Sequence, residues 1–211
     1  NQNAGLNISA RLIGSIDAAS NYNSANGENF IHVRGGTVGT TQTWPSTNAP
    51  YLSGSDGTVN GGLTISAGAT ILFETTAGID IMETGYLSAV GTASLPITFT
   101  GRYTSPGYWS AINIRSNNPN NKMNYVTLND GGSYWFYEYS SLSVSGRLEM
   151  DNCAISNSNS WAMRVGGSAQ IICSGAVQTT PEGITAYNNL SGNGLGADAD
   201  CVGGGCTVLF E

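Results

Sequence analysis

Few residues of this chain combine type and spacing in a way that suggests chemistry. Asp198 and Asp200 form an Asp-x-Asp pair in a glycine-rich turn, where carboxylate oxygens are candidate calcium ligands. No third acidic residue accompanies the pair, so we expect no cofactor, with calcium as the alternative. His32 is the only histidine, and no nucleophile motif such as G-x-S-x-G surrounds it, which argues against a hydrolytic triad.

A second candidate cluster contains Asp80, Asn113 and Arg115. Asp80 and Asn113 each lie between two isoleucines, in strand-like segments at residues 79–81 and 112–114. If one segment stacks directly on the other, the three polar side chains share one outer face. We expect a hydrogen-bonded polar patch there, with a catalytic or metal site as the alternative.

The most unusual segment of the sequence is aromatic. It follows the turn at residues 130–132, at a point where an insertion would leave the regular structure. Aromatic planes with polar edges suit both sugar rings and protein partners. We expect either a loop packed on the flank of the protein or a recognition patch. The candidate binding residues are Tyr134, Trp135, Phe136, Tyr137 and Tyr139, with Tyr108 and Trp109 from the preceding long turn.

The elements that must position these residues are short strands. From residue 63 to residue 101, pairs of apolar residues alternate with single intervening residues and are separated by glycine-bearing turns. Alternation of this kind places both apolar residues on one side of a strand. No window of helical length has convincing helical periodicity, so we expect very low helix content.

The apolar pairs recur at intervals of about 21 to 26 residues, which is typical of a solenoid. The predicted stacking places Leu63 on Leu87 and residues 79–81 on residues 112–114. The further pairings that we expect are Ile71/Phe73 with Ile97/Phe99, Val126/Leu128 with Leu148/Met150, Leu148/Met150 with Ile171/Cys173, and Leu142/Val144 with Met163/Val165. The expected fold is all-β, a parallel β-helix solenoid with about three short strands per coil.

The two ends of the chain differ from the middle. Residues 1–45 show weaker periodicity, and we expect an irregular N-terminal cap or an associating arm there. Residues 46–211 would form the β-helix, ending in a cysteine-containing loop and the apolar strand 207–210. That end strand either caps its own coil or pairs with a neighbouring molecule, which would support self-association into filaments.

Four cysteines supply a further constraint, without the Cys/His clusters typical of zinc sites. Cys201 and Cys206 enclose a flexible Val-Gly-Gly-Gly segment, which allows a small disulfide loop and favours an oxidising compartment. Cys153 and Cys173 are about one coil apart. Two stacked core thiols or a disulfide across neighbouring coils both fit that spacing.

Composition excludes some classes of partner. Only 10% of the residues are charged and the formal net charge is −7, which repels a nucleic-acid backbone and supplies no basic stripe. No stretch of about 18 apolar residues is present, so we expect no membrane span.

The sequence also resembles a known group of proteins. The segments that carry the resemblance are LTISAGATILFETTAGIDIMETGYLSAVGTASLPITFTG, PGYWSAINIR, MNYVTLNDGG and GRLEMDNCAISNSNSWAMRVGGSAQI. They are similar to right-handed parallel β-helix proteins of the pectate-lyase-like superfamily, and in particular to secreted surface proteins of Bacteroidetes-type bacteria. The resemblance implies a right-handed helix and a secreted or cell-surface location, but it does not fix an activity.

The leading functional hypothesis is a non-enzymatic extracellular module for adhesion, for binding a glycan or protein partner, or for self-assembly into a surface structure. The alternative is a polysaccharide lyase or glycoside hydrolase of the β-helix type. A hydrolase would need two carboxyl groups about 5 to 10 Å apart across a cleft. The sequence alone shows no such pair in an evident cleft.

Overall fold

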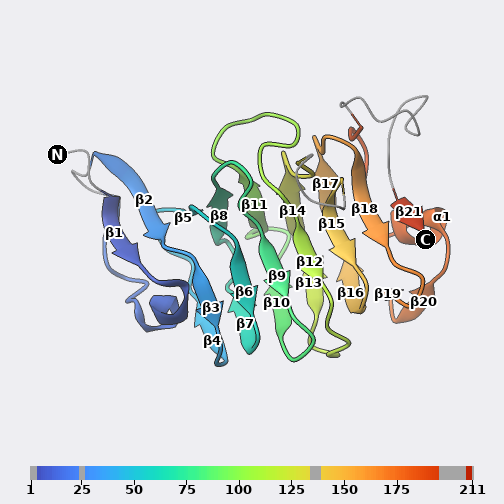
Figure 1. Ribbon diagram of the computed structural model, residues 1–211, viewed down its shortest axis with the longest axis horizontal. Helices are drawn as coiled ribbons and strands as arrows, with labels where there is room; N and C mark the ends of the chain where they lie inside the picture. The colour runs from blue at the N-terminus through green and yellow to red at the C-terminus, as the bar shows by residue number, and fades with distance from the viewer. Residues whose placement is uncertain (1–3, 24–26, 134–138, 195–207, 211) are drawn as a thin grey trace.

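The structure is a computed structural model that describes residues 4–23, 27–133, 139–194 and 208–210. Within these residues strands are the main regular structure, with one 3₁₀ helix, η1 (Ala10–Ser15), and one short α-helix, α1 (Pro181–Thr185). The expectation of an all-β protein with little helix is confirmed. Figure 1 shows the strands side by side along the long axis, with β1 at one end and α1 and β21 at the other.

The strands form three sheets of seven strands each. Sheet A contains, in spatial order, β1 (Ala4–Ile8), β2 (Glu28–Val33), β5 (Tyr51–Ser53), β8 (Thr70–Phe73), β11 (Ile97–Gly101), β14 (Val126–Asn129) and β17 (Ala154–Ser156). Sheet B contains β3 (Gly36–Val38), β6 (Gly57–Val59), β9 (Ile79–Ile81), β12 (Ile112–Ile114), β15 (Ser140–Val144), β18 (Trp161–Val165) and β21 (Val208–Phe210). Sheet C contains β4 (Gln42–Trp44), β7 (Gly62–Ile65), β10 (Tyr86–Val90), β13 (Lys122–Asn124), β16 (Arg147–Asp151), β19 (Gln170–Cys173) and β20 (Ala176–Gln178).

The order of the strands explains how the chain winds. From β2 to β19 the chain visits sheets A, B and C in turn, and each strand pairs in parallel with the strand three places further along. We call one such passage a coil. Among the strand pairs of the described residues, only β19 and β20 pair antiparallel. Three mostly parallel sheets connected in this way are compatible with a β-helix-like solenoid.

The core is built from side chains that point inward at alternate strand positions. In sheet A one such column is fully buried and crosses six coils, from β2 to β17: Ile31, Tyr51, Ile71, Phe99, Leu128 and Ile155. In β11 the intervening outward positions are polar, and Thr98 and Thr100 there are only partly buried. Burial of each large apolar side chain contributes about 1.5 to 3 kcal/mol, so the columns are the main source of stability.

Several of the predicted stacking relations are confirmed. Leu63 pairs with Leu87, and residues 79–81 pair with residues 112–114. Residues 142–144 pair with residues 163–165. Leu148 pairs with Ile171, as the sequence pattern indicated.

Two predicted relations are wrong. Ile71 pairs with Phe99 rather than Ile97, and Phe73 lies opposite Gly101, so the strand is shifted by two residues. A shift of two keeps the same side chains inward, and apolar alternation therefore cannot detect it.

The second wrong relation concerns residues 126–128, which we expected to stack on Leu148 and Met150. They lie in sheet A and pair with β17, whereas Leu148 and Met150 lie in sheet C. Strands of different sheets carry similar apolar pairs, so repeat spacing alone misassigned them.

The chain itself covers part of both ends of the stack of coils. Helix η1 packs on β3 and β4 with Ile13 fully buried, and the Gln42 side chain donates to Ala10 O and accepts from Gly14 N. Strands on both sides of residue 45 belong to the same sheets, since β4 pairs with β7. Whether residues 1–45 act as a cap or an arm stays a prediction. At the other end, β21 pairs with β18 of its own chain.

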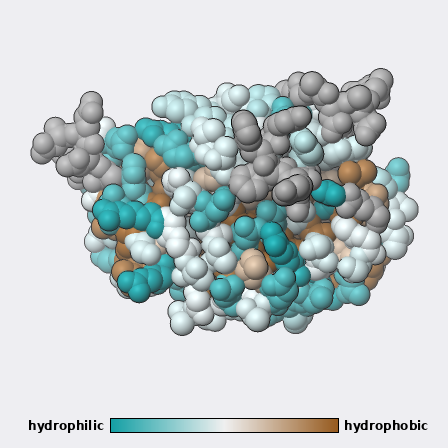
Figure 2. Space-filling model, in the orientation of Figure 1, coloured by the Kyte–Doolittle hydropathy of each residue, from teal (hydrophilic) through white to brown (hydrophobic). Residues whose placement is uncertain are grey.

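The surface agrees with the low content of charge. Figure 2 shows one face on which hydrophilic and neutral residues, teal and white, cover most of the area, with hydrophobic brown only in small regions. No helix in the part of the chain that the structure describes has the length and hydrophobicity of a membrane span.

Candidate ligand-binding surface

An arginine that joins two carboxylates forms the most developed polar cluster on the outer side of sheet A. Arg102 follows β11, and its backbone N donates to Phe73 O at 2.9 Å, so the sheet pairing continues one residue beyond the strand. Its guanidinium donates from Nη1 to Glu74 Oε1 at 2.5 Å and from Nη2 to Glu28 Oε1 at 3.0 Å. The three side chains are 24%, 31% and 30% exposed, respectively. The cluster is therefore partly desolvated but open to a ligand.

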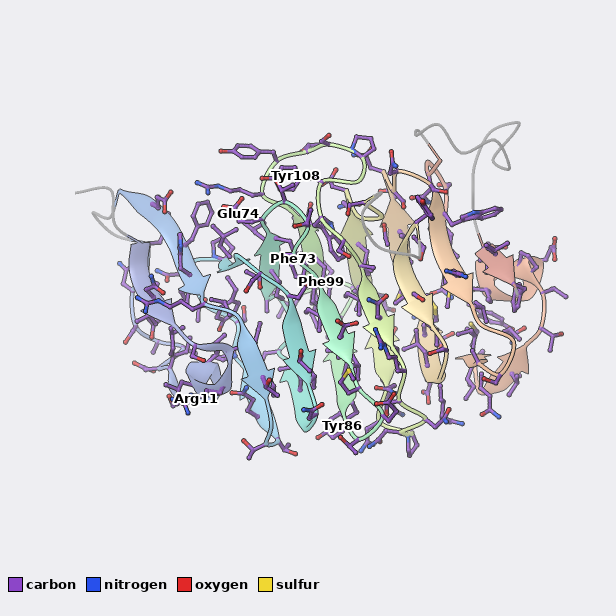
Figure 3. The ribbon with its side chains drawn as sticks, viewed as in Figure 1. Arg11, Phe73, Glu74, Tyr86, Phe99 and Tyr108 are labelled. Carbon is purple, nitrogen blue, oxygen red and sulfur yellow. The ribbon has the colours of Figure 1, made fainter. Side chains whose placement is uncertain are left out.

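Aromatic rings surround this guanidinium. Arg102 Cζ lies 5.4 Å from the centroid of Phe30 and 5.6 Å from that of Tyr103, within cation–π range. Tyr103 also meets Tyr108 edge-to-face at 5.7 Å, and the Tyr108 hydroxyl donates to Glu74 Oε2 at 3.1 Å. We call Glu28, Phe30, Glu74, Arg102, Tyr103 and Tyr108 the Arg102 cluster. Figure 3 shows Tyr108 on the loop after β11, with Glu74 close to it.

The electrostatic surroundings shift two pKa values in this cluster. The hydrogen bond from Arg102 to Glu74 is the main cause that raises the pKa of the guanidinium, with Glu28 adding to it. Partial burial is the first cause that raises the pKa of Tyr108. Both groups therefore keep their protons, and the cluster presents a fixed arrangement of donors and carboxylate acceptors.

His32 extends the cluster along β2. Its Nε2 atom lies 2.9 Å from Glu28 Oε2, although the ring is not aligned for a hydrogen bond through that nitrogen. Its ring centroid is 6.3 Å from that of Phe30. The histidine thus stands between the Arg102 cluster and the concave region beside it.

That concave region is an open hollow of about 510 Å³, a size typical of small-molecule sites. We call it the β2–β5 hollow. Its polar lining includes Asn7, His32, Arg34, Ser55 and Glu74, and Gly54 forms part of its wall. Because Glu74 belongs to both, the hollow and the Arg102 cluster form one continuous surface.

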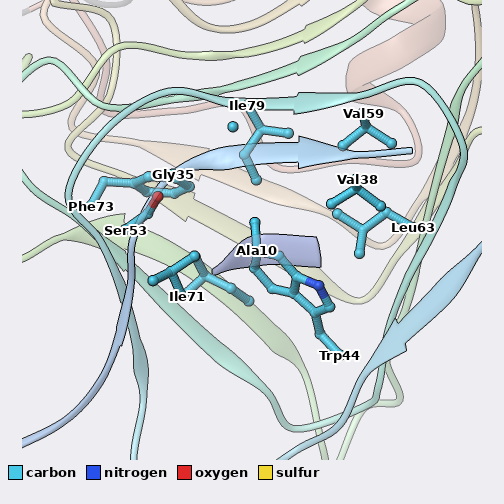
Figure 4. A pocket seen from close by; sticks show the side chains of 12 residues that line it. Ala10, Gly35, Val38, Trp44, Ser53, Val59, Leu63, Ile71, Phe73 and Ile79 are labelled. Atoms are coloured by element: carbon cyan, nitrogen blue, oxygen red, sulfur yellow. The ribbon is translucent and has the colours of Figure 1, made fainter. Parts of the chain in front are cut away.

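The interior between the sheets has a cavity of a different kind. Figure 4 shows it between inward side chains of the first coils, including Ala10, Val38, Trp44 and Ile71. Its volume is about 10 Å³, which is no more than a single water molecule needs. It is therefore a packing defect and not a ligand site.

The predicted polar patch at Asp80 is brought together by the fold. Asp80 Oδ1 accepts from Asn113 Nδ2 at 3.0 Å and from Arg115 Nη2 at 3.3 Å. Arg115 is 46% exposed. Burial, followed by the charge of Asp80, raises the pKa of Asp56. The stacking is confirmed, whereas a ligand at this patch stays a prediction.

The predicted aromatic patch stays a prediction as a binding surface. Tyr134, Trp135, Phe136 and Tyr137 lie outside the described residues. Tyr139 is 36% exposed, and Tyr108 belongs to the Arg102 cluster.

Trp109 requires a correction, because it is fully buried and is not available to a surface patch. Its ring stacks on Phe73 with centroids 4.4 Å apart, and its Nε1 donates to Asn129 O at 2.6 Å. Sequence shows that Trp109 is aromatic, but it does not show the opening in the core that the ring fills.

The other predicted site residues are the acidic pair and the two cysteines of the C-terminal loop. Asp198, Asp200, Cys201 and Cys206 lie outside the described residues, so the calcium pair and the small disulfide loop stay predictions.

A disulfide between Cys153 and Cys173, the alternative to two stacked core thiols, is absent, since both thiols are free and buried. They do not stack on one another either, because Cys173 ends β19 in sheet C and Cys153 follows β16 and leads into β17 of sheet A. Burial raises the pKa of Cys153 to about 12 and that of Cys173 to about 11.

Among the residues with described positions, no group of three or more His, Cys, Asp or Glu side chains is arranged to hold a metal ion. Comparison with protein-family models, with curated proteins and with solved structures yields no match for this chain.

Sequence reasoning missed Glu28, Glu74 and Arg102 as a group. A signal for part of it was present: Glu74 and Arg102 are 28 residues apart, and this is also the separation of the paired residues Ile71 and Phe99. The correct register in sheet A would have placed the two side chains together. No comparable signal points to Glu28, which is 74 residues from Arg102.

Proposed function

We propose that this chain is a non-enzymatic module of the right-handed parallel β-helix type, resembling the pectate-lyase-like superfamily, that binds a glycan on the outer side of sheet A. It would act in adhesion, as a secreted or cell-surface protein of a bacterium. The observation that carries the proposal is the Arg102 cluster, in which aromatic rings surround fixed hydrogen-bonding groups beside an open hollow.

Two properties of the cluster support a glycan as the ligand. Sugar rings present apolar C–H faces and hydroxyl edges, and Tyr103, which is 61% exposed, offers an open aromatic plane with a polar tip. Hydroxyl groups both donate and accept hydrogen bonds, and the cluster supplies a guanidinium donor and two carboxylate acceptors. A protein partner would use the same aromatic and arginine groups, and it is the second type of ligand that the proposal includes.

The proposal is tested by removing an exposed ring that contributes little to folding. Tyr103→Ala should weaken glycan binding about tenfold, because a contact residue at the centre of a binding surface is lost. Tyr187→Ala is the matched control and should bind like the wild type, because Tyr187 is 44% exposed and follows α1, which lies at the opposite end of the molecule from β1. A glycan array followed by calorimetry on the retained glycan measures both. Equal binding by the two variants would reject this surface.

A lyase or hydrolase is the alternative function, and the pair Glu28 and Glu74 is the observation that favours it. Against it, Arg102 donates to both carboxylates and so occupies the space that a scissile bond and a water molecule would require. The proposal predicts no release of reducing ends or unsaturated products from the bound glycan. Product formation that Glu74→Gln abolishes would establish the enzyme instead.

Self-association is a further part of the proposal. Strands β1 and β21 stand at the ends of sheets A and B, and strands in that position offer backbone groups for pairing with another molecule. Head-to-tail contacts between such ends would give filaments. Negative-stain electron microscopy across a concentration series tests this, and particles that remain single at every concentration would exclude it.

A further inference from the structure

The residues that line the β2–β5 hollow restrict the chemical class of ligand that it can bind. We propose that it is a subsite for one uncharged sugar ring of a glycan, an inference that rests on the function proposed above and specifies its ligand. The glycan would run from the aromatic rings around Arg102, past Glu74, into the hollow.

The residues that line the hollow supply both hydrogen-bond donors and hydrogen-bond acceptors. Arg34 donates from Nε to Asn7 Oδ1, which holds the guanidinium in place and leaves its other N–H groups as donors. Glu74 accepts from Arg102 through Oε1 and from Tyr108 through Oε2, and each carboxylate oxygen has a second lone pair for a ligand. Ser55 adds a hydroxyl to the same lining. A ligand rich in hydroxyl groups uses donors and acceptors together.

The charges around the hollow argue against an ionic ligand. An anion attracted to Arg34 would be repelled by Glu74. A cation attracted to Glu74 would be repelled by Arg34 and Arg102. The formal charge of the whole chain, −7, adds a long-range repulsion for polyanions. A neutral polyhydroxyl ligand avoids both penalties and keeps every hydrogen bond.

The wall of the hollow supplies a steric test. A Cβ atom built at Gly54 meets nothing within 4 Å, and the backbone there has no positive φ that would strain a larger residue. Gly54→Trp should therefore fold normally and fill the hollow. Gly39, in the turn between β3 and β4, is equally open, and Gly39→Trp is the matched control outside the hollow. Thermal melting should place both variants close to the wild type.

Affinity electrophoresis measures binding to soluble polysaccharides directly. The gels would contain xyloglucan, galactomannan or dextran as neutral probes, pectate as the acidic probe and chitosan as the basic probe. We expect a neutral gel to retard the wild type and Gly39→Trp, and Gly54→Trp to bind at least about tenfold more weakly.

The other outcomes separate the two proposals. If a neutral gel retards Gly54→Trp as strongly as the wild type while Tyr103→Ala is released, the hollow is not a subsite and the glycan-binding surface stands. If only pectate or chitosan causes retardation, glycan binding stands and the uncharged ligand is wrong. If no gel retards the wild type, both proposals fail.

Discussion

Replacement of Trp109 by alanine tests the packing beneath the proposed surface. Trp109 is fully buried, stacks on Phe73 at 4.4 Å and donates to Asn129 O at 2.6 Å. Phe73 itself stacks on Phe99 of the next coil, with centroids 6.4 Å apart. The indole therefore connects the loop that carries Tyr103 and Tyr108 to the inward column of sheet A.

The expected loss follows from the size of the side chain. Truncation of a buried tryptophan to alanine costs about 3 to 5 kcal/mol, through lost transfer free energy and the cavity left behind. For a chain of this length each kcal/mol lowers Tm by about 2 to 4 °C, so we expect a decrease of about 6 to 20 °C. Trp109→Phe keeps part of the stack but leaves Asn129 O without its donor, and it should cost about 1 to 3 kcal/mol.

Guanidinium denaturation and thermal melting, followed by far-ultraviolet circular dichroism, measure both changes. Tyr103→Ala is the contrasting variant, since its ring is mostly exposed and its loss should leave Tm within about 2 °C of the wild type. If Trp109→Ala melts with the wild type, the indole is not part of the core and the described geometry of the loop is wrong.

Two further predictions concern polar groups that the fold buries in part or in full. In a double-mutant cycle, Arg102→Met and Glu74→Gln should show a coupling free energy of about 1 to 2 kcal/mol in unfolding, because the two side chains are partly exposed and solvent weakens their interaction. Additive effects of the two substitutions would mean that the ion pair contributes nothing to stability. The free energy of unfolding should also decrease as pH rises from about 9 to 12. The Cys153 thiol ionises near its ordinary pKa of 9.0 in the unfolded chain, whereas burial in the folded chain raises this pKa to about 12, so high pH favours the unfolded chain. Denaturant midpoints at pH 8 and pH 10.5 measure this loss, which should be smaller in Cys153→Ala; an equal loss in that variant would assign the effect to other groups.

The sequence predicted the repeating architecture because strand alternation leaves a direct record. Inward residues such as Leu63 and Leu87 must be apolar in every coil, so their spacing shows which strands stack. The same logic placed Asp80, Asn113 and Arg115 on one face, and the structure has them in hydrogen-bond contact. The local pattern was sufficient for these two strand pairs.

The candidate surface was harder to predict, because it depends on register and on loops. A slip of two residues in sheet A preserves the alternation but separates Glu74 from Arg102 in the predicted stacking. The aromatic residues of the 102–111 loop divide between core and surface, with Trp109 inside and Tyr103 outside, and composition does not reveal this division. Contacts across several coils, such as Arg102 with Glu28, become visible only in the folded structure.

Hydrogen exchange of the wild-type chain, with and without the glycan that it retains, tests the glycan-binding surface most directly. We predict that the glycan slows exchange of backbone amides at residues 28–34, 52–55 and 102–108, and leaves α1 and β20 at the far end unchanged. Slower exchange confined to the far end, or no change at any of these segments, would contradict the assignment of the ligand to sheet A.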